Sequence, residues 1–241
     1  MAEALLSLAG VNTHIGQYHI LQGVDFEVPR AGLTMLLGRN GAGKTTCLRT
    51  VMGLWRASAG TIRYDGAEIT RTPTPDLARL GVAYVPENMG IFSGLTVREN
   101  LLLAAREKDL DARRLDWLFG LFPAMKKFWN SLAGNLSGGQ KQMLAISRAI
   151  VEPRKLLLID EPTKGLAPAI IAGLIEAFRE LKRAESTILV VEQNFHFARS
   201  LGDTVAVMDS GRIVHSGSMA ALAADEALQH RLLGLSLGAH Q

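Results

Sequence analysis

Apolar and polar residues alternate along much of the first seventy residues, and turn-forming residues separate the runs. A period of two is the pattern of strands that bury one face. Asp65 and Gly66 stand between residues 61–64 and 67–69, and Asp-Gly is a favoured two-residue hairpin turn. We therefore expect an antiparallel β element in this part of the chain.

Three short segments, residues 33–37, 156–159 and 187–191, are apolar without alternation. Such runs are typical of strands that are covered on both faces of a parallel sheet. After Lys44, apolar residues recur at helical spacing until Gly53, which predicts a strand, a glycine-rich loop and a helix in that order.

The period becomes helical from about residue 95 to residue 150. Two apolar stripes carry this pattern: Leu118, Leu121 and Phe122, then Met143, Ile146 and Ile150. We expect one domain, residues 1–241, into which a helical subdomain of approximately residues 88–155 is inserted. The end of the chain predicts a hairpin over residues 205–214 and then a helical tail over about 219–233.

The composition fits this organisation. A chain of 241 residues with 48 % hydrophobic residues can bury a sizeable core. Its net charge of +3 comes from 26 basic and 23 acidic residues without a concentrated basic tract, so nucleic acid is not an expected partner. The single cysteine, Cys47, cannot form an internal disulfide, and we expect a small buried side chain in a reducing compartment.

No apolar stretch reaches about 18 residues, and the first residues lack the basic segment of a secretory signal. We expect a soluble, cytoplasmic protein that can sit peripherally on a membrane partner, at the inner face of the cell membrane.

The glycine-rich segment fits the pattern of a phosphate-binding loop. Small residues let backbone N–H groups wrap a triphosphate, Lys44 reaches the β- and γ-phosphates, and the Thr45 hydroxyl is offered to Mg²⁺. The residues predicted to bind the nucleotide here are Gly38, Arg39, Asn40, Gly41, Ala42, Gly43, Lys44, Thr45 and Thr46. ATP and Mg²⁺ are the expected ligands.

Two carboxylates, Asp160 and Glu161, follow the apolar run at 156–159. The carboxyl edge of a parallel sheet is where the ligand sites of α/β proteins form. We expect Asp160 to hold Mg²⁺ through water, and Glu161 to polarise the water that attacks the γ-phosphate. A solvated acidic pair is the alternative for such a dipeptide on its own. The preceding apolar residues and the phosphate loop favour the site.

A second glycine-rich segment, Ser137, Gly138, Gly139 and Gln140, precedes a predicted helix. It places a hydroxyl and unpaired backbone N–H groups at a helix N-terminus, where an anion such as a triphosphate is favoured. An ordinary helix cap is the alternative interpretation.

These motifs, residues 38–45, 136–140 and 156–161, resemble those of the ATP-binding cassette ATPases in order and spacing. The resemblance covers essentially the whole chain. It implies an α/β fold with a P-loop NTPase core, a mostly parallel sheet, an antiparallel β subdomain and an α-helical subdomain. It also implies a Mg-dependent ATPase in which the signature motif, residues 137–140, closes on ATP held by a second cassette. The implied partners are transmembrane permease subunits.

Further segments are similar to the ATPases of branched-chain amino-acid uptake systems: residues 20–24, 82–87, 95–100, 161–168 and 191–194. Urea and short-chain amide importers share much of this pattern. The leading interpretation is an ATP-hydrolysing importer subunit for branched-chain or related amino acids, which works indirectly with an extracytoplasmic substrate-binding protein. The second cassette is either a copy of this chain or a related ATPase, and the resemblance favours the related ATPase.

Four positions depart from the usual cassette pattern. Glu87 stands where a glutamine usually meets Mg²⁺ and the attacking water, and its carboxylate can still ligate the metal. Gln193 stands where a histidine usually contacts the γ-phosphate; its amide can donate a hydrogen bond but does not titrate near neutral pH. Ala167 replaces an aspartate of the loop between subunits. Ile15 replaces an aromatic that stacks on adenine, a role we assign to Tyr18 or to Ile15 itself.

The resemblance thus implies Glu161, Lys44, Gln193 and Glu87 as catalytic residues, with Thr45, Asp160 and Glu87 at the metal. Two other functions stay open. A soluble cassette ATPase acting on DNA or ribosomes usually has a second cassette, a coiled coil or basic arms, which this chain lacks. A nucleotide-responsive regulator with little hydrolysis is suggested by the substituted positions.

The aromatic residues of the helical segment have two interpretations. They are Trp117, Phe119, Phe122, Phe128 and Trp129. In the first they are core residues. In the second, some of them join Met89, Ile91 and Phe92 in lining a groove for a permease helix, which the resemblance places between the helical subdomain and the core.

Overall fold

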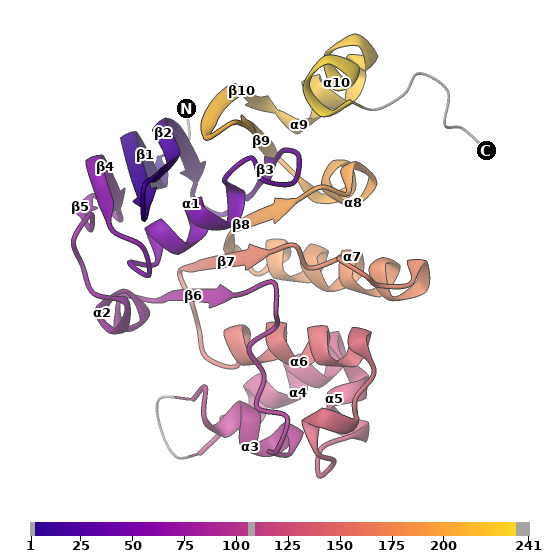
Figure 1. Ribbon diagram of the computed structural model, residues 1–241. Helices are drawn as coiled ribbons and strands as arrows, with labels where there is room; N and C mark the ends of the chain where they lie inside the picture. Colours follow the sequence, from indigo (N-terminus) through magenta and orange to yellow (C-terminus); the bar gives the residue numbers. More distant parts are fainter. Residues whose placement is uncertain (1–2, 106–108, 235–241) are drawn as a thin grey trace.

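A six-stranded sheet forms the centre of the molecule (Figure 1). The computed structural model describes residues 3–105 and 109–234. The sheet order is β10-β9-β3-β8-β7-β6, and all neighbouring strands are parallel except β9 and β10. The strands are β3 (Leu33–Leu37), β6 (Val82–Val85), β7 (Leu156–Asp160), β8 (Thr187–Glu192), β9 (Thr204–Asp209) and β10 (Arg212–Ser218).

The central strands are buried on both faces, as their uniform hydrophobicity predicts. Every residue of β3, β7 and β8 is buried. Successive side chains of a strand point to opposite faces, so Leu36 joins a first core on one face, and Met35 and Leu37 join a second core on the other. The sequence pattern therefore records two cores that share one sheet.

An antiparallel sheet packs beside the first core, in the order β2-β1-β4-β5. Its strands are β1 (Ala4–Ile15), β2 (Tyr18–Pro29), β4 (Ala57–Tyr64) and β5 (Ala67–Glu68). Tyr64 pairs with Ala67 across the Asp65-Gly66 turn, so the predicted hairpin is confirmed. Helix α1 (Lys44–Val51) lies between this sheet and the central one, and its Cys47 is buried there as expected (Figure 1).

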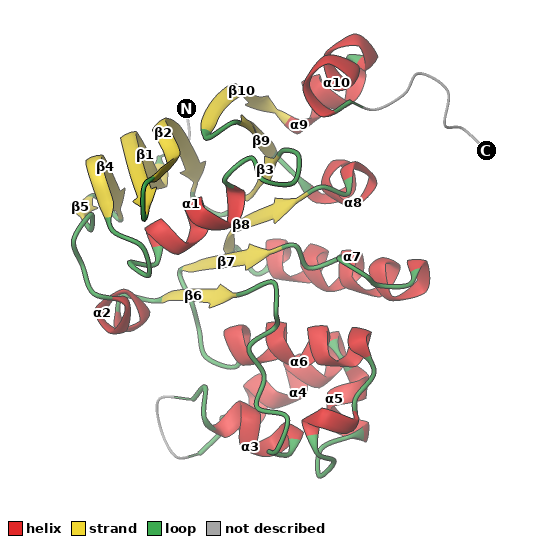
Figure 2. Cartoon of the chain, in the orientation of Figure 1, coloured by secondary structure: helices red, strands yellow, loops and turns green. Residues whose placement is uncertain are grey.

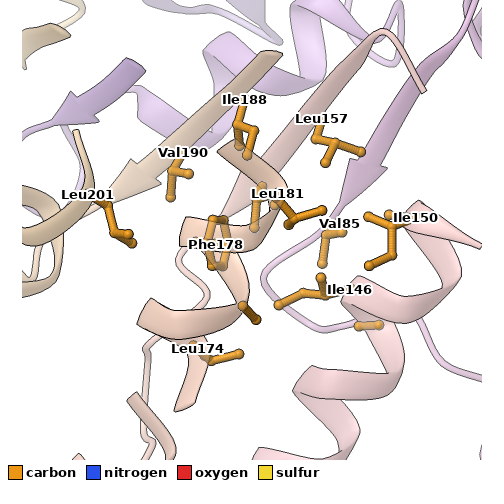
Figure 3. Packing of buried hydrophobic residues seen from close by; sticks show 14 of the residues in the cluster. Val85, Ile146, Ile150, Leu157, Leu174, Phe178, Leu181, Ile188, Val190 and Leu201 are labelled. Carbon is orange, nitrogen blue, oxygen red and sulfur yellow. The ribbon is translucent and has the colours of Figure 1, made fainter. Parts of the chain in front are cut away.

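Helices cover the opposite face of the central sheet (Figure 2). The second core lies there: Phe178 and Leu181 point towards Ile188 and Val190 of β8 (Figure 3). Apart from α1 and the group of helices beyond β6, the helices are α2 (Thr74–Arg79), α7 (Pro168–Arg183), α8 (Phe195–Leu201), α9 (Met219–Ala224) and α10 (Glu226–Leu233) in the described chain. Of these, α2 packs on the first core. The α/β fold class predicted from the sequence is confirmed.

A group of helices lies beyond β6, at the bottom of Figure 1. It comprises α3 (Val97–Leu102), α4 (Ala112–Leu121), α5 (Pro123–Lys127), the 3₁₀ turn Ala133–Asn135 and α6 (Gly138–Ile150). Of the predicted stripes, Leu118, Phe122, Ile146 and Ile150 are buried, whereas Leu121 and Met143 are partly buried. Ile146 and Ile150 face Val85 and Leu157 (Figure 3), so the helices share the second core. The boundary at 88–155 stays a prediction.

The tail differs from the expected single helical run. Helix α9 ends at Ala224, and Asp225 adopts an extended conformation before α10 begins. The Asp225 carboxylate accepts a hydrogen bond of 2.8 Å from the backbone N–H of Leu228, which caps α10. A capping residue therefore divides the tail into two short helices. Within the described residues, no helix is long and apolar enough to cross a membrane.

Candidate nucleotide site

The predicted phosphate loop joins β3 to α1, and two of its glycines are required by the backbone. Gly43 has φ of 108° where α1 begins, a conformation that L side chains rarely adopt. At Gly38, a Cβ atom would lie 2.2 Å from the carbonyl oxygen of Met208. The Lys44 ammonium donates to the carbonyl oxygens of Gly38 at 2.9 Å and Arg39 at 3.1 Å. The lysine therefore curls back over the loop.

A cavity of about 320 Å³ opens in front of this loop. Its walls come from segments that follow β3, β6 and β7, together with one residue of β2. The lining residues are Ile20, Asn40, Gly41, Gly43, Lys44, Thr45, Thr46, Glu87, Glu161 and Lys164. The cavity thus lies at the carboxyl edge of the parallel sheet, where the sequence places the site.

Asp160 lies behind the cavity and is only 1 % exposed. Its carboxylate accepts hydrogen bonds from the hydroxyls of Thr45, at 3.1 Å, and Tyr84, at 3.3 Å. Burial raises the pKa of Asp160 to about 6, and the negative charge of Glu161 adds to this. The carboxylate is thus poorly compensated by its protein partners, which is an environment that favours a bound cation.

These donors fit Mg²⁺, which usually takes one or two protein oxygens and completes its shell with phosphate and water. Asp160 and Thr45 provide a carboxylate and a hydroxyl side by side. Among residues 3–105 and 109–234, there is no group of three or more histidine, cysteine or acidic side chains that could hold a metal ion. A metal here would therefore need ligands from outside the protein.

Glu161 is held in a fixed and strained position. Its φ of 46° lies in the left-handed region, which is costly for a residue with a side chain. Its backbone N–H donates to Val191 at 2.9 Å, and its Oε1 accepts a hydrogen bond of 2.6 Å from Gln193 Nε2. Lys44 Nζ lies 3.5 Å from the same oxygen. The carboxylate of Glu161 is thereby oriented beside the loop lysine.

Gln193 and Glu87 also reach this region, by different contacts. Gln193 Nε2 donates to Asn40 Oδ1 at 2.6 Å as well as to Glu161, so it bridges the loop and the carboxylate. The Glu87 carboxylate lies 2.5 Å from the ammonium of Lys164. The structure therefore brings Lys44, Thr45, Glu87 and Glu161 together around one cavity, with Asp160 behind it. Gln193 does not line this cavity and reaches it through its hydrogen bonds to Asn40 and Glu161.

The signature motif lies elsewhere. None of Ser137, Gly138, Gly139 or Gln140 lines the cavity, and α6 belongs to the group of helices beyond β6 (Figure 1). The Ser137 hydroxyl accepts from the backbone N–H of Gln140, and the Gln140 side chain accepts from the backbone N–H of Ser137. These reciprocal bonds are a capping box. Within one chain, the motif therefore caps a helix and does not reach the phosphate loop.

The proposed adenine contacts lie at the tip of the β1–β2 hairpin, where Ile15 pairs with Tyr18. The Tyr18 side chain is largely exposed. Neither lines the cavity, whereas Ile20 does, and their role stays a prediction.

Sequence reasoning assigned no role to two residues that shape the site. Lys164 lines the cavity, and buried Glu192 holds the loops that carry Thr163 and Gln193. The only signal for Lys164 was a basic residue three positions after Glu161, which is common on protein surfaces. Glu192 ends an apolar strand next to Gln193, and its role depends on a loop 29 residues away.

Residues 21–164 match the protein family that is described as ABC transporter. The chain belongs to the ABC transporter family. The high-affinity branched-chain amino acid transport ATP-binding protein BraG of Pseudomonas aeruginosa is 40 % identical over 95 % of this chain and 100 % of that protein. The probable branched-chain amino acid transport ATP-binding protein LivF of Archaeoglobus fulgidus is 35 % identical over 94 % of this chain and 95 % of that protein.

Solved structures agree with this assignment. The structure of an ATP-binding subunit of an ABC transporter is 31 % identical, with a TM-score of 0.80 over 97 % of this chain and 96 % of that one. The ADP conformation of another ATP-binding cassette has a TM-score of 0.80 at 23 % identity and supports the fold alone. This ABC protein is a nucleotide-binding, ATP-hydrolysing P-loop ATPase and a transporter component.

Proposed function

We propose that this ABC ATPase powers the uptake of branched-chain or related amino acids. The observation that carries the cargo is the similarity, over nearly the full length of each chain, to BraG and LivF, two proteins named for branched-chain amino acid transport. An importer of urea or short-chain amides is the second candidate, because those ATPases resemble the same segments.

The cavity supports a division of labour among its residues. The backbone N–H groups of residues 38–46 and the ammonium of Lys44 bind the phosphates of ATP. Thr45 and Asp160 would hold Mg²⁺, with Glu87 as a further ligand candidate. Bound there, Mg²⁺ would neutralise charge on the phosphate oxygens.

Glu161 acts on water in this proposal. Its carboxylate accepts a proton from the water that attacks the γ-phosphate, and its strained backbone and the hydrogen bond from Gln193 keep it in place. Gln193 bridges Asn40 and Glu161, so it also ties the phosphate loop to the base. Because a glutamine amide does not titrate near neutral pH, Gln193 orients groups and carries no proton.

The position of the signature motif supports a two-cassette enzyme. Since Ser137 to Gln140 do not reach the cavity of their own chain, they are available to a nucleotide held by a second cassette. The N-terminus of α6 carries a serine and two glycines, of which Ser137 and Gly138 are exposed, and such a helix end suits a phosphate. We propose that the second cassette is a related ATPase or another copy of this chain.

A groove beside β6 supports docking of a permease subunit. It has a volume of about 360 Å³, and its walls include Met89 and Gly90 from the loop after β6 and Arg148 from α6. The guanidinium of Arg148 lies 5.0 Å from the ring centre of Phe92, which is exposed. Transmembrane permease subunits would place the protein at the cytoplasmic face of the membrane, with an extracytoplasmic binding protein as an indirect partner.

The aromatic residues of the helical group have little part in that groove. Phe122 is buried in the core, and Phe119 packs edge-on against Trp129. Trp117 and Phe128 pack against the same core and do not line the groove. The packing interpretation therefore suits these residues, whereas Met89 fits the docking interpretation.

A capture experiment tests the proposal. Tagged Glu161→Gln protein would be loaded with ATP in native membranes, recovered in mild detergent, and its partners identified by mass spectrometry. Two polytopic permeases and a second ATPase are the expected partners, and the Lys44→Ala variant is the control for capture that depends on nucleotide. Ribosomal or DNA-bound partners, or none, would contradict the transport role. Uptake of labelled leucine against labelled urea by cells lacking the protein then distinguishes the two cargoes.

A further inference from the structure

Lys164 connects two carboxylates of the cavity. Its ammonium lies 2.5 Å from Glu87 Oε1 and 3.6 Å from Glu161 Oε2. The Lys164 side chain is 56 % exposed and that of Glu87 is 39 % exposed, so the Glu87 pair faces the open cavity. Hydrogen bonding to Glu87 is the main cause of the raised pKa of Lys164. The lysine is therefore charged, and it stands where phosphates would enter.

The backbone fixes the place of this lysine. The N–H of Lys164 donates to the Glu161 carbonyl oxygen at 3.2 Å, which closes a tight turn. The preceding residue, Thr163, donates its N–H and its hydroxyl to the buried carboxylate of Glu192, at 3.0 and 2.7 Å. Because the turn is anchored on both sides, Lys164 projects from a rigid support beside Glu161.

The charges that line the cavity balance only with this residue included. The charged lining residues within the described chain are Lys44 and Lys164, against Glu87 and Glu161. Without Lys164, one carboxylate would face the polyphosphate without compensation. A glutamine at position 87 would carry no charge and would need no such partner. The charge of Lys164 therefore compensates a negative charge that Glu87 adds to the cavity.

We propose that Lys164 is a positioning residue for nucleotide binding, which holds the Glu87 carboxylate to one side of the cavity and cancels its charge towards the phosphates. This inference rests on nucleotide occupying the cavity, as proposed above. It assigns Lys164 an effect that acts through Glu87. Removing Lys164 should therefore weaken binding only while Glu87 is negative.

A double-mutant cycle tests this dependence. The affinity for a fluorescent ADP analogue would be measured in EDTA, which removes divalent metal, for wild type, Lys164→Met, Glu87→Gln and the double variant. We expect Lys164→Met to weaken ADP binding by about three- to tenfold, which is the range for leaving one partly exposed charge uncompensated near the phosphates. The double variant should return to within about twofold of wild type. Lys164→Arg should bind like wild type.

The controls separate this effect from damage to the fold and from failure of the nucleotide site. Lys155→Met removes another exposed lysine paired with a carboxylate, Asp65 at 2.7 Å, away from the cavity, and should leave ADP affinity unchanged. In steady-state assays with Mg·ATP, Lys164→Met should raise KM more than it lowers kcat. The inference would be overturned if Lys164→Met bound ADP as tightly as wild type, or if the double variant bound ADP as weakly as Lys164→Met. In either case, ADP binding by the wild-type protein would still support the nucleotide site.

Discussion

Glu192 is the residue whose removal tests the described site most sharply. Its side chain ends β8 and is only 2 % exposed. One carboxylate oxygen accepts from the N–H and hydroxyl of Thr163, and the other accepts from the N–H groups of Gln193 and Asn194, at 2.9 and 3.0 Å. This carboxylate therefore joins the loop after β7, which carries Lys164, to the loop that carries Gln193.

The cost of Glu192→Ala follows from these four bonds. A hydrogen bond to a charged group contributes about 1.5–3 kcal/mol, and a buried donor left unpaired costs about 1–3 kcal/mol. The two bonds from Thr163 are buried, whereas the N–H groups of Gln193 and Asn194 are part-buried and can be hydrated once the carboxylate is gone. We therefore expect the free energy of unfolding to fall by about 3–5 kcal/mol.

Urea denaturation measures this loss, provided that the m-value of the variant matches that of wild type. Glu192→Gln should cost less, about 1–3 kcal/mol, because its amide oxygen can still serve Thr163 while its NH₂ group opposes the other donors. Exposed Glu176, which pairs with Arg179, is the control, and Glu176→Ala should change stability by less than about 1 kcal/mol. A loss below about 1 kcal/mol for Glu192→Ala would refute the reasoning.

Two further predictions concern the packing. In urea unfolding, Gly60→Ala should destabilise the protein by at least about 2 kcal/mol more than Gly66→Ala. Both glycines have positive φ, but of the two only Gly60 would place a Cβ against backbone, 2.3 Å from the Gly10 carbonyl oxygen. Equal costs would contradict this packing. Burial raises the pKa of Cys47 to about 12, so its thiol should react with a disulfide reagent at pH 8 at least about a thousandfold more slowly in native than in unfolded protein. Comparable native and unfolded rates would show that Cys47 is exposed.

The elements around the site were predictable because their signals are local. The strand at 33–37, the loop and the helix after Lys44 follow from an apolar run, glycines and helical spacing. Because β3 and β8 are buried on both faces, their sequences are hydrophobic without alternation. The carboxyl edge of such strands then places Asp160 and Glu161 near the loop.

The relations that depend on tertiary structure were not predictable from one sequence. Glu192 and Lys164 look like ordinary charged residues, and their partners Thr163 and Glu87 are 29 and 77 residues away. The break at Asp225 separates two short helices because a side-chain cap competes with helix continuation, a choice that periodicity does not resolve. Whether the capping box at Ser137 meets a phosphate depends on a second chain.

Phosphate release with Mg·ATP, measured for wild type and for Glu161→Gln, tests the central claim most directly. Nucleotide affinity measured on the same samples separates binding from chemistry. The account predicts that the variant still binds ATP while its hydrolysis falls by about a thousandfold or more, because the group that accepts the proton of water is gone. Turnover equal to that of wild type would contradict the assignment of Glu161 as the base.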